Sequence, residues 1–336
     1  MQVQQNYSLK EYNTFGIDAL AKYFSAFQTA EQLKEIIENK KAESKMILGG
    51  GSNILFTKNY DGLVLKNEID GINIVDEDDQ FVFITAGAGV KWHSFVMYCV
   101  NQNLGGVENL SLIPGNVGAS PMQNIGAYGA EIKDVFYELK ALHLNEKSIH
   151  KFSSAECEFG YRESVFKKKY KDEFAILNVT FRLRKNPVFN ISYGAIETEL
   201  KKMHVETLSV KAISDAVIQI RLSKLPDPSV IGNAGSFFKN PVITKEQMEK
   251  IQQHHLNLPF YKADEENFKI PAGWLIEQCG WKGFRKGDAG CYEKQALVLV
   301  NYGNATGKEI YSLSEEIKLS VNEKFQIELE REVNIL

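Results

Sequence analysis

Apolar residues recur every three to four positions in several separate stretches of the chain, which is the spacing of one helix face. In the last of these stretches, Ile310, Leu313, Ile317 and Val321 fall on a single face. Two stretches begin with a threonine that is followed three residues later by a glutamine, as in a capping box. We therefore predict amphipathic helices over residues 29–40, 92–105, 244–255 and 310–325.

Other stretches alternate apolar and polar residues, or are short apolar runs, and these indicate strands. We predict strands over residues 46–48, 81–88, 174–183 and 326–336. In the last of them the apolar residues share one face, and Glu328, Glu330 and Glu332 share the other. The alternation does not tell which glutamate matters, and a solvated edge strand would account for carboxylates in such a row. Helices and strands mixed along a chain without repeats predict an α+β fold.

Length and composition are those of an ordinary globular enzyme. The 336 residues predict two or three domains, and the net charge of −4 argues against a nucleic-acid binder. No apolar stretch approaches the roughly 20 residues of a membrane span, and the first residues lack the apolar core of a signal peptide. The four cysteines show no metal-binding spacing, and the adjacent His254 and His255 point to different helix faces, so no metal site is predicted. We expect a cytoplasmic protein.

Ser236 lies in the segment Asn233-Ala-Gly-Ser-Phe-Phe-Lys-Asn-Pro241, with no histidine in the ten residues on either side. The G-x-S-x-G elbow of hydrolases is also missing. A hydroxyl that no base deprotonates is better suited to donating a proton than to attacking a carbonyl. The alternative is a serine that caps a glycine-rich turn.

Two glycine-rich segments point to a ligand with phosphate groups. The first, Gly49-Gly50-Gly51-Ser52-Asn53, follows an apolar run, and its glycines allow backbone N–H groups to approach an anion closely. The second, residues 111–131, holds four glycines and two prolines, yet it also contains many apolar residues. N–H groups on a diphosphate and apolar side chains against a ring would explain that mixture. The alternatives are a tight turn between two strands for the first segment and an irregular buried loop for the second.

Together these segments resemble one family, the UDP-N-acetylenolpyruvoylglucosamine reductases of peptidoglycan precursor synthesis. The resemblance runs from Asn13-Thr-Phe-Gly16 to Glu332, and it includes the motifs I-P-G-x-V-G-A-x-P-x-Q-N-I-G-A-Y-G and Tyr161-Arg-Glu-Ser164. It implies an FAD-binding domain of the vanillyl-alcohol oxidase-like (PCMH) type in two subdomains, plus a smaller α+β substrate-binding domain. The implied ranges are 1–224 for the FAD domain, with a core at about 17–184, 225–325 for the substrate domain, and 326–336 for a terminal strand that carries Glu332.

The resemblance also implies a reaction. NADPH would reduce non-covalently bound FAD, and the flavin would pass the hydride to the enolpyruvyl ether of UDP-N-acetylglucosamine. By the same resemblance, Arg162 and Glu332 hold the substrate carboxylate and the developing enol, and Ser236 donates the proton. A monomer is expected, with this UDP-sugar and NADPH as its ligands and no nucleic-acid or membrane partner.

The family motifs also assign binding residues. Pro187–Gly194 matches the family class whose inserted loop carries a substrate-covering tyrosine, here Tyr193. Substrate contacts are implied for Tyr193, Lys224 and Asn240. FAD contacts are implied for Gly49, Gly50, Gly51, Ser52, Asn53, Ile113, Pro114, Gly115, Gly118, Ala119, Ser120, Gln123, Asn124, Gly126 and Ala127.

Two other functions are compatible with parts of the pattern. An FAD-dependent oxidase of alcohols or lactones would share the fold, but such enzymes commonly attach the flavin through a histidine or cysteine near the phosphate loops. Residues 46–56 and 106–131 contain neither. A non-catalytic nucleotide-sugar or flavin-binding module would leave Arg162, Ser236 and Glu332 without a common purpose.

Overall fold

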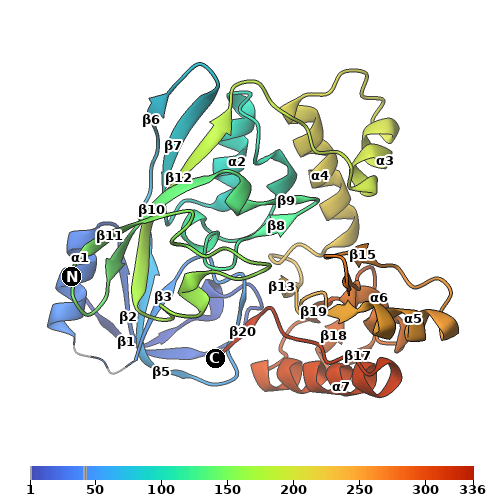
Figure 1. Ribbon diagram of the computed structural model, residues 1–336. Helices are drawn as coiled ribbons and strands as arrows, with labels where there is room; N and C mark the ends of the chain where they lie inside the picture. Colours follow the sequence, from blue (N-terminus) through green and yellow to red (C-terminus); the bar gives the residue numbers. More distant parts are fainter. Residues whose placement is uncertain (1, 41, 43) are drawn as a thin grey trace. The chain divides into compact units, whose positions relative to one another are not determined.

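The computed structural model describes residues 2–40, 42 and 44–336, and the chain divides into two compact units. The first unit comprises Met1–Tyr7, Leu20–Gly51 and Tyr60–Ser223, and the second comprises Ser8–Ala19, Ser52–Asn59 and Lys224–Leu336. Figure 1 shows helices and strands in both units, which confirms the predicted α+β class. The functional ranges 1–224, 225–325 and 326–336 stay a prediction. The compact units also break the chain near residue 224, but they assign 8–19 and 52–59 to the second unit.

The first unit begins with a four-stranded sheet in which three neighbouring strands run parallel. The strand order is β1 (Gln4–Ser8), β2 (Leu20–Phe27), β5 (Tyr60–Asn67) and β3 (Lys45–Leu48). Helix α1 (Ala30–Asn39) buries Leu33, Ile36 and Ile37 in the core beside this sheet. The Thr29 hydroxyl accepts the Gln32 N–H at 3.2 Å, which confirms the predicted helix start. Parallel pairing brings the carboxyl ends of β2, β5 and β3 to one edge of the sheet.

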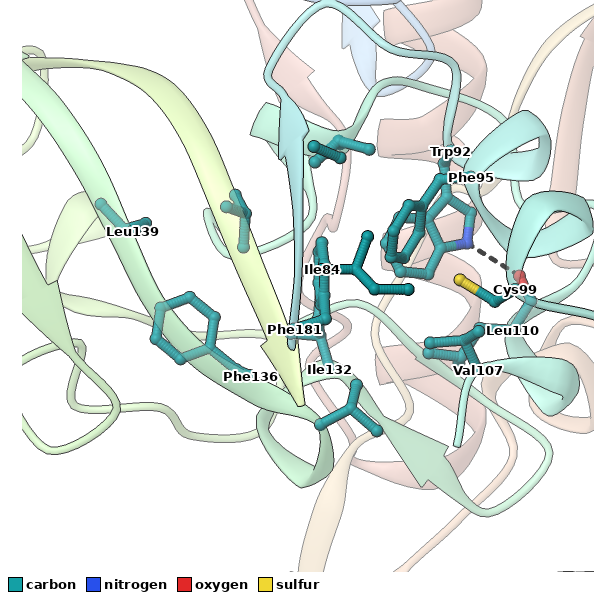
Figure 2. Close-up of a cluster of buried hydrophobic side chains, with 14 of the residues drawn as sticks. Ile84, Trp92, Phe95, Cys99, Val107, Leu110, Ile132, Phe136, Leu139 and Phe181 are labelled. Carbon is teal, nitrogen blue, oxygen red and sulfur yellow. Dashed lines mark hydrogen bonds between the residues drawn. The ribbon is translucent and has the colours of Figure 1, made fainter. Parts of the chain in front are cut away.

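A second, antiparallel sheet forms the larger part of the same unit. Its order is β11 (Ile149–Ser153), β10 (Phe136–His143), β12 (Phe174–Arg184), β7 (Phe81–Gly87) and β6 (Ile72–Glu77). Helix α2 (Trp92–Asn101) packs on it through Trp92 and Phe95, which contact Phe181 (Figure 2). The Trp92 indole N–H donates to the carbonyl of Leu110 at 2.8 Å. The core therefore fixes the residues immediately before the second glycine-rich segment.

Two helices and a short hairpin complete the first unit. Helices α3 (Gly194–Lys202) and α4 (Val210–Lys224) share a small core of Ile196, Leu200, Ile213, Ala216, Val217 and Ile220. Strands β8 (Gly126–Ala127) and β9 (Ala130–Glu131) pair within the second glycine-rich segment. Single-turn 3₁₀ helices lie at Lys10–Tyr12, Glu108–Leu110, Val117–Ala119, Ile132–Asp134 and Val165–Lys167.

The second unit is built on two small sheets. One has the order β13 (Gly232–Ser236), β19 (Val298–Asn301), β18 (Ala289–Cys291) and β17 (Arg285–Lys286), and the other has the order β14 (Val242–Thr244), β16 (Asn267–Lys269) and β15 (Tyr261–Lys262). The helices are α5 (Lys245–His254), α6 (Ala272–Gln278) and α7 (Gly307–Phe325). The predicted face of α7 is buried, and α5 starts with the predicted capping box at Thr244. In the described part of the chain, no helix has the length and apolar character of a membrane span.

The predicted strand over residues 326–336 is wrong as a continuous element. The alternation of burial is present at Ile327 and Leu329, but only β20 (Asn334–Ile335) is a strand, paired in parallel with β4 (Ile54–Leu55). Upstream, Arg331 forms an isolated bridge with Phe238. The tail therefore changes backbone partner along its length, which a two-residue period does not reveal.

Candidate functional site

The first glycine-rich segment leaves the carboxyl end of β3 and does not form a hairpin turn. Strand β3 pairs with β5, whereas β4, which follows the segment, pairs with β20 in another sheet. The segment connects two strands of different sheets, and its role in binding a ligand stays a prediction. Gly51 is buried and has φ +63°, a conformation that favours glycine.

The two glycine-rich segments touch each other within the first unit. A Cβ atom placed on Gly50 would lie 2.9 Å from the Cα of Gly115 and 2.9 Å from Oδ1 of Asn116. Among the described residues, neither the Gly50 N–H nor the Gly115 N–H has an acceptor. Two backbone donors without a protein partner, on loops that only glycine allows to approach so closely, are what a diphosphate requires.

Several side chains of the second segment are used to build it. The Asn124 amide donates to Glu131 Oε2 at 3.1 Å and to the Gly160 carbonyl at 3.0 Å, and its Oδ1 accepts the Lys133 N–H at 3.1 Å. The buried Ser120 hydroxyl donates to the Val117 carbonyl. The donors of both side chains are used by protein groups, and the predicted contacts of Ser120 and Asn124 with FAD stay a prediction.

The remaining members of the segment contribute apolar surface and close packing. Ile113 and Ala127 pack against the core of the first unit. A Cβ atom on Gly118 would lie 2.5 Å from the Cβ of Ala88, so only glycine lets the loop lie on the end of β7. The segment is irregular over much of its length, and Ser120 and Asn124 supply hydrogen bonds to protein groups.

A cavity of about 140 Å³ opens beside both segments. Gly49, Gly118 and Ala119 line it together with apolar residues such as Ile47, Met122, Phe166 and Ile176, and with the polar residues Lys45, Asn67 and Asp172. All of its lining residues belong to the first unit. An apolar slot with a few polar groups suits a flat heteroaromatic ring that is attached to the diphosphate.

Arg162 belongs to the first unit and has φ +55°. One of its terminal nitrogens donates to the Gly126 carbonyl at 2.6 Å, which ties the guanidinium to the second glycine-rich segment. The neighbouring Glu163 forms a salt bridge with Lys168 at 3.3 Å. Arg162 is therefore held against the second glycine-rich segment of the same unit.

Tyr193, the predicted substrate-covering tyrosine, immediately precedes α3 and is 42% exposed. Its ring packs edge-on against Tyr128 with the centroids 5.6 Å apart. Lys224 is the exposed last residue of α4. The sequence did not single out Tyr128 as a site residue, although Tyr128 lies within the motif I-G-A-Y-G. Burial raises the pKa of the Tyr128 hydroxyl.

Ser236 does not cap its turn. The side chain that caps it is Asn233, whose Oδ1 accepts the Gly235 N–H at 2.9 Å. Ser236 ends β13 with an exposed side chain, and no hydrogen-bond partner for its hydroxyl occurs in the described ranges. The geometry removes the capping alternative and leaves a hydroxyl that is free to act on a ligand.

Glu332 lies on a segment that pairs with the residues after Ser236. The Glu332 N–H donates to the Phe237 carbonyl at 2.9 Å, and the Lys239 N–H donates to the Glu330 carbonyl at 2.9 Å. Two of the three predicted catalytic residues are thereby neighbours within the second unit. Asn53 supports this arrangement, because its side-chain amide donates to the Glu332 carbonyl at 3.2 Å.

The other two glutamates of the tail are not both free in solvent. Glu328 lies 3.6 Å from Lys318 and is largely exposed, as a solvated edge implies. Glu330 differs, because its Oε1 lies 2.6 Å from Nζ of Lys239, an ammonium whose side chain is only 9% exposed. Glu330 is exposed, as the solvated-edge interpretation expects, but it also pairs with a buried lysine, which the residue order does not reveal.

Asn240 also has a structural partner. Its Oδ1 accepts the Ala272 N–H at 2.9 Å and so caps the first turn of α6. The two N–H donors of its amide remain for a ligand. The Asn240 side chain therefore caps α6 with its oxygen, and its NH₂ group is available for a substrate contact.

Comparisons with known proteins agree with this geometry. Residues 227–336 match the model of the UDP-N-acetylenolpyruvoylglucosamine reductase C-terminal domain, and residues 21–150 match an FAD binding domain. The UDP-N-acetylenolpyruvoylglucosamine reductase of Flavobacterium johnsoniae is 52% identical over the full length of both chains. The reductase of the same name from Bacteroides fragilis is 45% identical over 99% of this chain and 100% of its own. The chain belongs to the UDP-N-acetylenolpyruvoylglucosamine reductase family.

The fold agrees with the family as well. The crystal structure of the Thermus caldophilus reductase (MurB) superposes with a TM-score of 0.71 at 23% identity and covers 100% of this chain and 99% of that one. Family membership makes the chain an oxidoreductase with an FAD-binding domain, as the glycine-rich segments predicted.

Proposed function

We propose that this protein uses NADPH and FAD to reduce the enolpyruvyl ether of UDP-N-acetylglucosamine, and that the product is UDP-N-acetylmuramate. Membership in the UDP-N-acetylenolpyruvoylglucosamine reductase family supports this proposal. The observation that carries the chemistry is the pairing that makes Ser236 and Glu332 neighbours, together with a serine hydroxyl that has no partner in the described part of the protein.

The reaction explains why these residue types are needed. When bound, FAD supplies hydride transfer between the nicotinamide and the substrate. Hydride adds to the terminal methylene carbon of the enolpyruvyl group, and the electrons of the double bond then build negative charge on the carboxylate as an enolate, so the site needs a cation and a hydrogen-bond donor there. We assign the cation to Arg162, whose fork of N–H donors matches two carboxylate oxygens.

Ser236 and Glu332 complete the proposed chemistry. A serine without a neighbouring base keeps its proton, and the enolate carbon that bears the carboxylate requires one, so Ser236 is assigned as the proton donor. Glu332 beside a substrate carboxylate must be protonated or share a proton, because two like charges would repel. Tyr193, Lys224 and Asn240 are assigned to the UDP diphosphate and nucleotide.

The FAD assignment rests on the first unit. We place the diphosphate at the N–H groups of Gly50 and Gly115, which have no acceptor among the residues described, and the adenine in the cavity that Gly49 helps to line. The chain has no second dinucleotide fingerprint, so NADPH and the UDP-sugar would use one pocket in turn. We further propose a monomer in the cytoplasm.

Anaerobic mixing tests the function directly. Purified protein should show flavin absorbance bands that acid releases, NADPH should bleach them, and the enolpyruvyl substrate should restore them. Protein that binds no flavin overturns the proposal. Flavin that NADPH reduces but the enolpyruvyl substrate does not reoxidise would favour an oxidase of the same fold.

A further inference from the structure

Lys66 reaches the first glycine-rich segment from the adjacent strand. It lies next to the end of β5, in register with Leu48 at the end of β3. Its Nζ donates to the carbonyl of Gly49 at 2.7 Å. Because β3 and β5 are parallel, both carboxyl ends lie at the same edge, where α/β proteins bind ligands.

The ammonium of Lys66 is poorly compensated by the protein. Its side chain is partly buried, and burial lowers its pKa, while the charge of the Glu68 carboxylate opposes this shift without reversing it. Across residues 2–40, 42 and 44–336, no carboxylate lies within ion-pair distance of it, and the Gly49 carbonyl is its one hydrogen-bond acceptor. Removing a charge from water costs free energy unless an opposite charge or strong hydrogen bonds compensate it. An unpaired, partly buried cation is therefore suited to an anion.

The bond to Gly49 also fixes the direction of the next N–H. The peptide group between Gly49 and Gly50 is planar and trans, so its carbonyl and its N–H point in opposite directions. Since Lys66 holds the carbonyl, the N–H of Gly50 points away from Lys66. That N–H is one of the two donors without an acceptor in the described part of the chain, beside Gly115.

We propose that Lys66 is a positioning residue for the diphosphate of FAD. Its ammonium holds the Gly49–Gly50 peptide with the N–H toward the phosphate oxygens, and its positive charge polarises that peptide and favours the anion. The inference rests on the proposed use of FAD and adds a residue that the glycine motif does not contain. Loss of the charge should weaken binding of the diphosphate and leave contacts to the rings unchanged.

The test compares apoproteins in which the position is changed stepwise. Lys66→Met keeps much of the apolar stem and removes the charge, Lys66→Gln keeps a neutral donor, and Lys66→Arg keeps the charge. The matched control is Lys22→Met on β2, an exposed lysine that pairs with Asp61 at 2.7 Å. FAD affinity is measured by quenching of flavin fluorescence at low and high salt, and ADP and adenosine are measured as competitors.

We expect Lys66→Met to bind FAD and ADP about tenfold to a hundredfold more weakly, the effect of losing one charge-assisted hydrogen bond. Adenosine affinity should stay unchanged, the salt dependence of FAD binding should be smaller, and Lys66→Arg should restore most of the loss. Wild-type affinity in Lys66→Met, or equal losses for ADP and adenosine, would overturn the inference.

Two further outcomes are separable. If Lys66→Met does not fold, the same comparison is made with Lys66→Gln, for which a smaller but still diphosphate-specific loss is expected. Wild-type protein that fails to bind FAD would instead refute the proposed function.

Discussion

Replacement of Glu330 by glutamine separates the structural carboxylate of the tail from the catalytic one. Glu330 pairs with Lys239, whose side chain is 9% exposed, whereas the carboxylate side is 69% exposed. Glu330→Gln keeps the shape and an oxygen acceptor but removes the charge. We expect a less stable protein whose catalysis is nearly normal, because Glu330 is not the residue assigned to the substrate.

The magnitude lies between two limits. Breaking a fully buried ion pair costs about 3–5 kcal/mol, and losing an exposed pair costs about 0.2–1 kcal/mol. One buried and one exposed partner place the loss at about 1–2 kcal/mol. For a unit of this size each 1 kcal/mol lowers Tm by roughly 4 °C, so a decrease of about 4–8 °C is expected.

The assay measures thermal unfolding and the two half-reactions of Glu328→Gln, Glu330→Gln and Glu332→Gln. Glu328→Gln is the control, since its 3.6 Å contact with Lys318 is exposed and worth little. Glu332→Gln should slow flavin reoxidation by substrate about tenfold to a hundredfold, the effect of one hydrogen bond to developing charge. The reasoning is refuted if Glu330→Gln slows reoxidation with an unchanged Tm, because Glu332 then loses its assignment.

The other predictions concern the cofactor, the proton, the substrate and pH. Gly50→Val should give folded but flavin-poor protein, since its Cβ would lie 2.9 Å from the Cα of Gly115, and full flavin occupancy would contradict this. Ser236→Ala should leave reduction by NADPH intact and slow reoxidation by roughly 10²–10⁴-fold, whereas equal slowing of both steps would indicate a structural serine. Tyr193→Phe should weaken substrate binding without changing the flavin spectrum, and lost flavin would place this tyrosine in the wrong site. Burial raises the pKa of Glu108 in the folded protein. The protonated carboxyl therefore contributes to folding stability, fully below pH about 4.3, and this contribution is lost as the pH rises through the folded-state pKa. Glu108→Gln should therefore gain Tm over wild type as the pH rises from 4.5 to 8, and a constant difference would contradict the burial effect.

Elements with a strong local period could be predicted from the sequence. The apolar face of α7 follows the helical period, and β12 is an apolar run that is buried on both faces over most of its length, so each leaves a direct record in residue order. The tail has the same kind of record, yet it is not one strand, because Arg331 bridges Phe238 and Asn334 pairs with Ile54. The choice of backbone partner depends on segments distant in sequence, so a local pattern does not contain it.

The candidate site was only partly visible in the sequence for a related reason. Motifs located Ser236 and the glycine-rich segments, but the sequence left open whether the serine caps a turn. That question is decided by Asn233, which takes the capping role. Lys66 and Lys239 were missed because a lysine in a sequence carries no mark of burial, and partial burial is what gives each of them a specific partner.

Asn53 shows how a motif residue can serve a protein contact. The glycine motif assigned it to FAD, yet its amide donates to the Glu332 carbonyl and its carbonyl accepts the backbone and side-chain N–H groups of Asn334. Aspartate at this position would keep the size and remove the donor. Such a change would act on the backbone that carries Glu332, and so on the proposed substrate step before any effect on flavin. Asn53 is thus the residue that both the cofactor motif and the fold favour. Its hydrogen-bond partners show the contribution to the fold.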